Sequence, residues 1–538
     1  MAASTDHNVK QNDFYLVSEL GITVRNDYGN TPTDKQKLYN SKLKTYREMV
    51  LATLGVFCKR HQDVVYAADV IAASGLCGLQ WKKYYGDKVH VTVADRDAID
   101  KMEDNCKQNG FTPVVKPVDS TRTPGLPLES QTDIEIRVSL CTPNVLMHLE
   151  AFHFLFVAPH KSFTNFADSA FFTLKNNGIV SFVCSNVSSF SRCPEVAQRY
   201  HGASSTKTEF SKELAARISV ASIARAAARC NKGIEVLLVA SVEDFLLLTV
   251  RVHRGPRPAD SSMAQICRLL YCQICEDQVF LPQRKATIED PYSLLPCDCQ
   301  KMTPGRTAVE LGPLWSGKMF NSVFLSEMLE EGTRLKLSTK FHLLVTSLLE
   351  EARCGESELH IVSSSGGMPM TTPQEEGHVL TDSDATQPDS ENKCDMKSQG
   401  EESSKETEKF SENVATSGRT QTPSLNSAVS SDDCSNHTDS RKRIAEEEIE
   451  NCKRQKLDAD DSALMSDDTI IPPAFYLSLE RRKNYPDVIM PKVQKVVAFL
   501  KADGYSASRT HFSATAVRTN ANHSQLCKVL NKYCHKKK

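Results

Sequence analysis

The chain has 538 residues, a length typical of roughly two to four domains, and 40% of them are hydrophobic, enough for a sizeable buried core. Aromatic residues make up only 7% and the mean hydropathy is −0.37, so we expect part of the chain to lie outside that core. The formal net charge of −2 indicates no class of partner, and the lack of an 18-residue apolar run argues against a protein that crosses a membrane.

The N-terminal residues show no basic segment followed by an apolar stretch, so we expect no secretory signal. The 18 cysteines then belong to a reducing compartment, where clustered cysteines bind metal more often than they form disulfides.

Apolar, strand-like runs alternate with helical stretches over residues 1–255. This alternation predicts an α/β sheet with helical crossovers. Strands are predicted at 65–71, 89–94, 152–157, 178–184 and 236–240, and helices at 43–60 and 212–229.

Three further regions follow. Residues 256–360 form a smaller unit with paired cysteines. Residues 361–470 are dominated by Ser, Thr, Asp, Glu and Gln, and we expect a disordered linker because such a composition buries too little apolar surface to offset its ordering entropy. Residues 471–538 hold 13 Lys or Arg against 3 Asp or Glu, a balance of +10, and predict a basic α+β domain.

A strand, a small-residue turn and a helix occur in succession from Val65 to Tyr85, with Gly75 and Gly78 in the turn. This order is typical of a dinucleotide or S-adenosylmethionine site, because small residues let the backbone approach the ligand. Asp95 ends the next predicted strand, about 20 residues after the turn, where an acid can bind ribose hydroxyls. A nicotinamide cofactor is the alternative, and so is a ligand-free domain in which the glycines only allow tight helix–strand packing.

Several segments, taken together and in order, resemble the tRNA guanine-N2 dimethyltransferase family over residues 15–350 and 471–530. They are Leu38–Lys44, Tyr46–Glu48, Ala73–Leu76, Asp168–Ala170, Lys212–Arg229, Gly312–Trp315, Ser508–His511 and Arg518–Thr519. The stretch 224–235 is similar to the animal tRNA methyltransferase 1-like branch. The resemblance implies a class I S-adenosylmethionine (SAM) methyltransferase fold, SAM as cofactor and the exocyclic N2 of a tRNA guanine as methyl acceptor.

The resemblance also implies roles for single residues. Arg47 and Asp69 would lie in the cofactor pocket, Asp95 would bind the ribose, and Thr142 and Pro143 occupy the place of the family's Asp-Ala beside the adenine.

The chain departs from the family at the loop that follows the predicted strand 152–157. That loop reads Ala158-Pro159-His160-Lys161, whereas the family has an aspartate at the first position. Alanine can neither accept a proton nor orient an amine. Cys77 replaces an arginine of many members, and Ser185-Asn186 replaces Thr-Asp. Two hypotheses follow: an active methyltransferase, with His160 as one candidate base, or a catalytically degenerate tRNA-binding paralogue.

Two close pairs of cysteines suggest a metal site. Cys272-x-x-Cys275 is followed 22 positions later by Cys297-x-Cys299, a set that suits a closed, structural Zn²⁺ site. Cys267 is a possible substitute ligand, and free thiols are the alternative.

The basic C-terminal region predicts an RNA-facing surface that binds tRNA. Its residues include Tyr505, Arg509, His511, Phe512, Arg518 and the tail Lys536–Lys538. A solvated basic domain without a nucleic-acid partner is the alternative. Basic clusters at 441–443 and 453–456 resemble a bipartite nuclear localisation signal, so we expect the nucleus, including the nucleolus, unless these residues form a charge-balanced helix with 446–448. The sequence leaves the oligomeric state, the target tRNA and the number of methyl groups added open.

Overall fold

The computed structural model describes residues 14–27, 39–95, 98–116, 131–132, 134–159, 162–281, 290–303, 305, 307–354, 474–480 and 489–534. The predicted linker 361–470, its basic clusters, the loop residues His160 and Lys161, and the tail Lys536–Lys538 lie outside the described residues and stay predictions. Within the described ranges, no helix combines the length and apolar character needed to cross a membrane.

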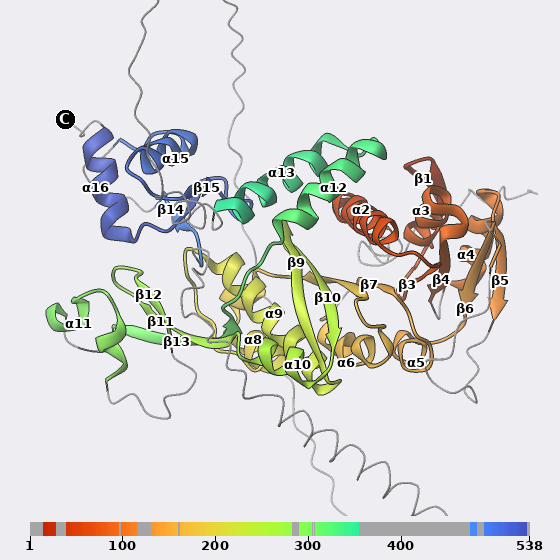
Figure 1. The fold of residues 1–538 in the computed structure, drawn as a ribbon, viewed down its shortest axis with the longest axis horizontal. Helices are drawn as coiled ribbons and strands as arrows, with labels where there is room; N and C mark the ends of the chain where they lie inside the picture. The colour runs from red at the N-terminus through yellow and green to blue at the C-terminus, as the bar shows by residue number, and fades with distance from the viewer. Residues whose placement is uncertain are drawn as a thin grey trace, which may run out of the picture. The chain divides into compact units, whose positions relative to one another are not determined.

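An eight-stranded sheet dominates the described chain, in the order β5-β6-β4-β3-β7-β8-β10-β9 (Figure 1). The neighbours from β5 to β8 pair in parallel, and β10 runs antiparallel to both β8 and β9. In sheet order the strands span Thr112–Lys116, Glu135–Ser139, Val89–Ala94, Val65–Asp69, Phe154–Val157, Ile179–Ser185, Phe245–Arg254 and Lys232–Val242. The predicted α/β sheet is therefore confirmed.

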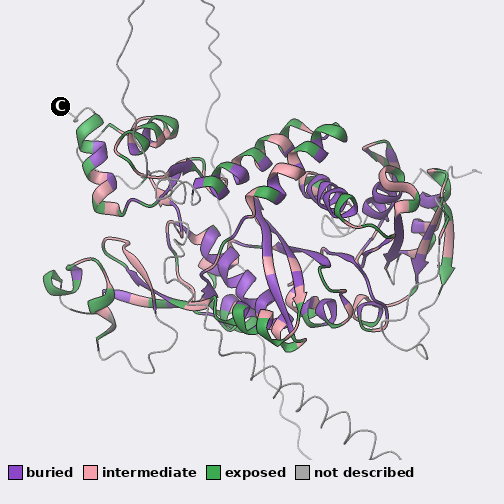
Figure 2. Ribbon diagram, in the orientation of Figure 1, coloured by how far each residue is buried: buried purple, intermediate pink, exposed green. Residues whose placement is uncertain are grey.

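Helices connect these strands. The helical segments up to Met263 are η1 (Ser41–Leu43), α2 (Lys44–Arg60), α3 (Leu76–Tyr85), η2 (Gly86–Lys88), α4 (Ile99–Gln108), α5 (Pro143–Leu149), α6 (Thr164–Thr173), α7 (Ser189–Arg192), α8 (Pro194–His201), α9 (Ser211–Arg229) and α10 (Pro256–Met263). Proline occupies the first helical position of α5, α8 and α10, where its missing N–H has no intrahelical acceptor to lose. The central strands and α9 are buried over nearly their whole length (Figure 2).

The chain order creates a crevice at the centre of the sheet. After β3 the chain forms β4 on one side, and after β6 it crosses back to form β7 on the other side of β3. In an open parallel sheet, ligands bind at the carboxyl ends of the strands where the winding direction changes. The ends of β3 and β7 are therefore the place to look for a ligand site.

Smaller elements complete the described chain. The hairpin β1 (Phe14–Glu19) and β2 (Ile22–Asp27) precedes η1, and a three-stranded sheet contains β11 (Ile266–Cys272), β12 (Gln278–Leu281) and β13 (Ala308–Trp315). This sheet is accompanied by η3 (Pro291–Leu294) and α11 (Cys299–Met302), and followed by α12 (Ser322–Arg334) and α13 (Thr339–Cys354). The C-terminal elements are β14 (Leu477–Ser478), α15 (Val493–Ala502), β15 (Ala507–Arg509), β16 (Ala516–Thr519) and α16 (His523–Tyr533).

Candidate cofactor site

A cavity of about 480 Å³ opens at this switch point of the sheet. Its walls come from η1 and α2, from the turn between β3 and α3, and from the carboxyl ends of β7 and β8. The lining residues are Tyr39, Asn40, Leu43, Tyr46, Arg47, Asp69, Ile71, Ala72, Ala73, Ser74, Leu76, Cys77, Phe156, Ala158, Pro159, Val183, Ser185, Asn186 and Phe245.

The turn between β3 and α3 has the backbone shape that its small residues allow. Ala73 and Gly75 adopt positive φ values of 50° and 77°, and Gly75 directly precedes α3. The Ala73 N–H donates to Oδ2 of Asp95 over 3.1 Å, which fixes the turn against the end of β4. Gly78 has a different role, because a Cβ there would lie 2.3 Å from Cγ1 of Val93. Gly75 shapes the turn, whereas Gly78 allows α3 to pack closely on β4.

Asp69 ends β3 and is the one carboxylate among the described residues that line the cavity. Its side chain is 2% exposed, and Oδ1 has no hydrogen-bond partner among the described residues. Burial raises the pKa of Asp69 to about 7, and the nearby charge of Asp95 adds to this, while hydrogen bonds from the Ile71 N–H and the Cys77 thiol oppose it. The cavity therefore holds a carboxyl group whose ionised form needs a cationic or hydrogen-donating partner.

Arg47 is buried in the cavity wall and is already paired. Its Nε and Nη2 donate to the Glu19 carboxylate over 2.9 and 2.6 Å, and Nη1 donates to the Asn40 carbonyl over 3.1 Å. Tyr39 donates its hydroxyl to Glu19 over 2.7 Å and lies beneath the guanidinium. Although burial alone would raise it, the pKa of Glu19 is lowered by Arg47. This pair joins the N-terminal hairpin to the rim of the cavity.

Ala158 and the buried Pro159 follow β7 and line the cavity, so the position of the family's aspartate faces this space. Tyr46 is not a substitute base, because its hydroxyl accepts from the Val242 N–H and bonds to the carbonyls of Ala240 and Phe245. Burial also raises its pKa well above the usual value. Asn186 follows β8, is exposed, has a positive φ of 56° and offers a neutral amide to the cavity.

The structure brings together some of the residues predicted from the sequence and leaves others apart. Arg47, Asp69, Cys77, Ala158 and Asn186 all line the cavity, as does Pro159. The described lining does not include Asp95, Thr142 or Pro143; Asp95 supports the turn, and Thr142 is the exposed residue before α5. Their predicted contacts with the ribose and the adenine stay predictions.

Several apolar and aromatic residues that line the cavity were not predicted from the sequence. These are Phe156, Val183 and Phe245, together with Tyr39 and Tyr46. The two tyrosines lie in segments that carried the family resemblance, which was the available signal. The three others are ordinary core strand residues by their pattern, and only the register of the sheet places them at the cavity.

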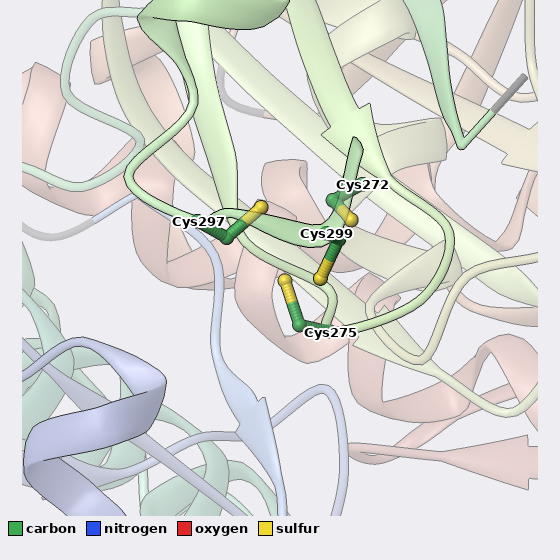
Figure 3. A group of neighbouring side chains, drawn as sticks. All are labelled: Cys272, Cys275, Cys297 and Cys299. Carbon is green, nitrogen blue, oxygen red and sulfur yellow. The ribbon is translucent and has the colours of Figure 1, made fainter. Parts of the chain in front are cut away.

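The four predicted zinc ligands gather at one place beside the three-stranded sheet (Figure 3). Cys272 ends β11, Cys275 lies in the turn to β12, and Cys299 begins α11 just after Cys297. All four Sγ atoms lie within 4.8 Å of one another. A tetrahedral site with Zn–S bonds of about 2.3 Å requires sulfur separations of about 3.8 Å, so a small side-chain adjustment suffices. Cys267, the substitute ligand considered above, donates to Ser316 and is not part of this group.

The prediction of an RNA-facing surface was wrong for three C-terminal residues. Phe512 is 1% exposed, Arg518 is 3% exposed, and the His511 side chain is 2% exposed. The burial of Arg518 and His511 is possible because each is paired with a carboxylate from a distant part of the chain. Arg518 pairs with Glu213 and Glu351, and His511 pairs with Glu351. Arg509, which was also predicted, is exposed, and the other exposed cations of this region include Lys492, Lys495, Lys501, Lys528 and Lys532.

Comparison with known proteins is consistent with this geometry. The family model for N2,N2-dimethylguanosine tRNA methyltransferase matches residues 18–363 and 441–531. A tRNA (guanine(27)-N(2))-dimethyltransferase of Bos taurus is 34% identical over 506 residues, 93% of this chain and 60% of the relative. A tRNA (guanine(26)-N(2))-dimethyltransferase of Methanobrevibacter smithii is 24% identical over 61% of this chain and 77% of the relative.

One solved structure shares the fold. Trm1 from Pyrococcus horikoshii, in complex with S-adenosyl-L-methionine, matches with a TM-score of 0.59 at 16% identity, covering 96% of this chain and 99% of that chain. The predicted Rossmann-like methyltransferase fold is thereby confirmed. The chain spans only about 60–65% of the length of the animal relatives it matches.

Proposed function

Because this chain belongs to the N2,N2-dimethylguanosine tRNA methyltransferase family, we propose that it binds S-adenosylmethionine in the cavity at the ends of β3 and β7 and methylates N2 of a guanine in tRNA. The observation that carries the proposal is the buried carboxyl group of Asp69, whose Oδ1 has no hydrogen-bond partner among the described residues.

The donors around the cavity fit this cofactor. S-adenosylmethionine carries positive charge on its ammonium and sulfonium groups, and it supplies the methyl group when bound. Asp69 would hold a cationic group of the cofactor, since ionisation of a buried carboxyl group is stabilised by an opposite charge. Arg47 would form part of the cavity wall without contributing a free positive charge, because its guanidinium is already paired with the Glu19 carboxylate. Asp95, at the end of β4, would bind the ribose hydroxyls while retaining the N–H of Ala73.

The methyl acceptor would meet a wall without a catalytic acid. The lone pair of guanine N2 is delocalised into the ring, so a nearby acceptor for its N–H bonds orients and activates it. Ala158 cannot provide that acceptor, and the described lining offers neutral groups such as the amides of Asn40 and Asn186 in its place. This observation favours a second candidate function, a tRNA-binding paralogue that has lost methyl transfer.

The test compares wild-type protein with Ala158→Asp and Ala158→Asn, each incubated with labelled S-adenosylmethionine and total tRNA. The asparagine matches the size of the aspartate and accepts hydrogen bonds, but it takes up no proton near neutral pH. Transfer by the wild type supports the enzyme. Transfer by Ala158→Asp alone supports the degenerate paralogue and identifies the missing acid. A wild-type protein that binds neither S-adenosylmethionine nor tRNA refutes both functions.

The remaining proposals concern partners and location. We propose that Cys272, Cys275, Cys297 and Cys299 hold a structural Zn²⁺, since the cysteine group leaves no ligand position for catalysis. The exposed C-terminal lysines would bind the phosphates of tRNA. The basic clusters at 441–443 and 453–456 would direct the chain to the nucleus, and replacing both clusters with alanine in a fluorescent fusion tests this by microscopy.

A further inference from the structure

A buried group of charges joins the C-terminal region to the rest of the fold. Arg518, at β16, donates through Nε to Oε2 of Glu351 over 2.9 Å and through Nη2 to Oε2 of Glu213 over 2.8 Å. Glu213 belongs to α9 and Glu351 to α13, and both carboxylates are fully buried. One guanidinium therefore bridges two carboxylates that lie 138 positions apart in the sequence.

The two carboxylates receive further donors from both sides of this junction. Glu351 accepts from the His511 N–H over 2.7 Å and from the Thr510 hydroxyl over 2.9 Å, and its Oε1 lies 2.5 Å from Nδ1 of His511. Glu213 accepts from Arg217, four residues along α9, over 3.1 Å and from the Phe475 N–H over 3.1 Å. Well-satisfied charges of this kind fix one geometry, because a displaced arrangement leaves a buried charge unpaired.

The pair Glu213 and Glu351, with Arg217 and Arg518, carries no net formal charge. Although burial alone would raise it, the pKa of Glu351 is lowered to about 2 by His511 and Arg518. Separating the C-terminal region from α9 and α13 would expose all of these charges to water at once. An apolar contact allows its two surfaces to shift against each other, whereas these charge pairs hold them in one position.

Each helix of the junction packs against an element that lines the cavity, α13 against α2 and α9 against β10. Ser338, directly before α13, donates its hydroxyl to Glu48, the neighbour of the cavity residue Arg47. Helix α9 packs against β10, whose Phe245 also lines the cavity. The charged junction is thus connected by direct packing to two of the elements that line the cavity.

We propose that Arg518, bound by Glu213 and Glu351, is a positioning residue that holds the basic C-terminal region at a fixed place relative to the cavity, so that the protein selects which nucleotide of a bound tRNA reaches the cavity. This inference rests on the proposed function. It assigns to Arg518 an internal role, and it leaves phosphate binding to exposed side chains such as Lys492, Lys495 and Lys528.

The test needs a variant that breaks the junction without leaving an unpaired charge. Arg518→Met combined with Glu351→Gln removes one charge of each sign, and Arg518→Lys keeps the charge but has one nitrogen with which to reach two carboxylates. Arg509→Met is the matched control, because Arg509 belongs to the same region but is exposed and lies 3.8 Å from Glu350 outside the junction. Circular dichroism checks that each full-length variant is folded.

The readout is the pattern of contacts with a tRNA transcript that carries photoreactive 4-thiouridine. Peptides crosslinked to the RNA are assigned to the cavity walls or to α15 and α16, and affinity is measured by filter binding. We expect the double variant to keep its crosslinks to α15 and α16 and to lose cavity crosslinks several-fold, with Arg518→Lys in between. Arg509→Met should weaken binding slightly without changing the ratio of the two classes. Where methyl transfer is present, kcat should fall by about tenfold or more with KM little changed.

The outcomes separate this inference from the function on which it rests. Cavity crosslinks that are unchanged in both folded junction variants overturn the positioning role while leaving the proposed function intact. A loss of both crosslink classes in proportion, as for a domain that has simply unfolded, also overturns it. A wild-type protein that does not bind tRNA overturns the proposed function and this inference together.

Discussion

Replacement of Asp69 by asparagine tests the electrostatics of the cavity directly. The buried carboxyl group has a pKa of about 7, against 3.8 in an exposed position, because burial disfavours its charge. The folded protein therefore binds an extra proton between these values. The stabilising effect of that proton is fully present below pH 3.8 and is lost as the pH rises through about 7.

The magnitude follows from the two pKa values. Their difference corresponds to roughly 4 kcal/mol of stability lost at high pH, at about 1.36 kcal/mol per unit. Asparagine has no charge to lose, so the stability of Asp69→Asn relative to wild type should increase by roughly 2–3 kcal/mol between pH 5 and pH 8. At about 2 °C per kcal/mol, this is a change of roughly 5 °C in the Tm difference.

Differential scanning fluorimetry at pH 5 and pH 8 measures this change without cofactor. Asp168→Asn serves as the control, because Asp168 forms an exposed pair with Arg229 that contributes little to stability. Addition of S-adenosylmethionine at pH 8 should raise the Tm of the wild type more than that of Asp69→Asn. A Tm difference that is the same at both pH values would refute the reasoning, because it would mean that Asp69 ionises in the folded protein as easily as in water.

Three further predictions concern other parts of the fold. Cys275→Ser should lower the zinc content measured by atomic absorption and the Tm together, and full zinc occupancy in that variant would contradict the proposed site. Gly78→Ala should lower the free energy of unfolding in urea by about 1–3 kcal/mol, because the new Cβ would meet Val93 at 2.3 Å; an unchanged urea midpoint would contradict the packing argument. Lys528→Gln should weaken tRNA binding and reduce the slope of log Kd against log salt by about one, whereas an unchanged slope would place Lys528 away from the phosphates.

The sequence predicts the sheet well because its strands are short apolar runs between recognisable helices. The predicted strand 89–94 coincides with β4, whereas the predicted strand 65–71 is longer than β3, since Val70 and Ile71 already belong to the turn. The same local signals correctly place the glycine turn and the cysteine pairs. The departures from the family at Ala158 and Cys77 could also be predicted to share one pocket, because both follow parallel strands whose carboxyl ends meet.

What the sequence could not predict depends on partners that are distant along the chain. Arg518 looks like one more cation in a basic segment, and only its bonds to Glu213 and Glu351 reveal that it is internal. Arg47 likewise carries no visible sign that Glu19 of the first hairpin neutralises it. A charge count cannot separate buried, paired cations from exposed ones, since both contribute equally to it.

The charged junction also fixes both ends of the segment between Cys354 and Phe475. Cys354 ends α13 and bonds to the carbonyl of Arg518, while Phe475 donates its N–H to Glu213. Cys354 and Phe475, on either side of this segment, therefore both bond to residues of the charged junction. Closing a loop becomes only about 0.6 kcal/mol more costly for each doubling of its length. Insertions and deletions in this segment should therefore leave the folded body nearly as stable as before, which makes it a suitable place for a fluorescent or affinity tag.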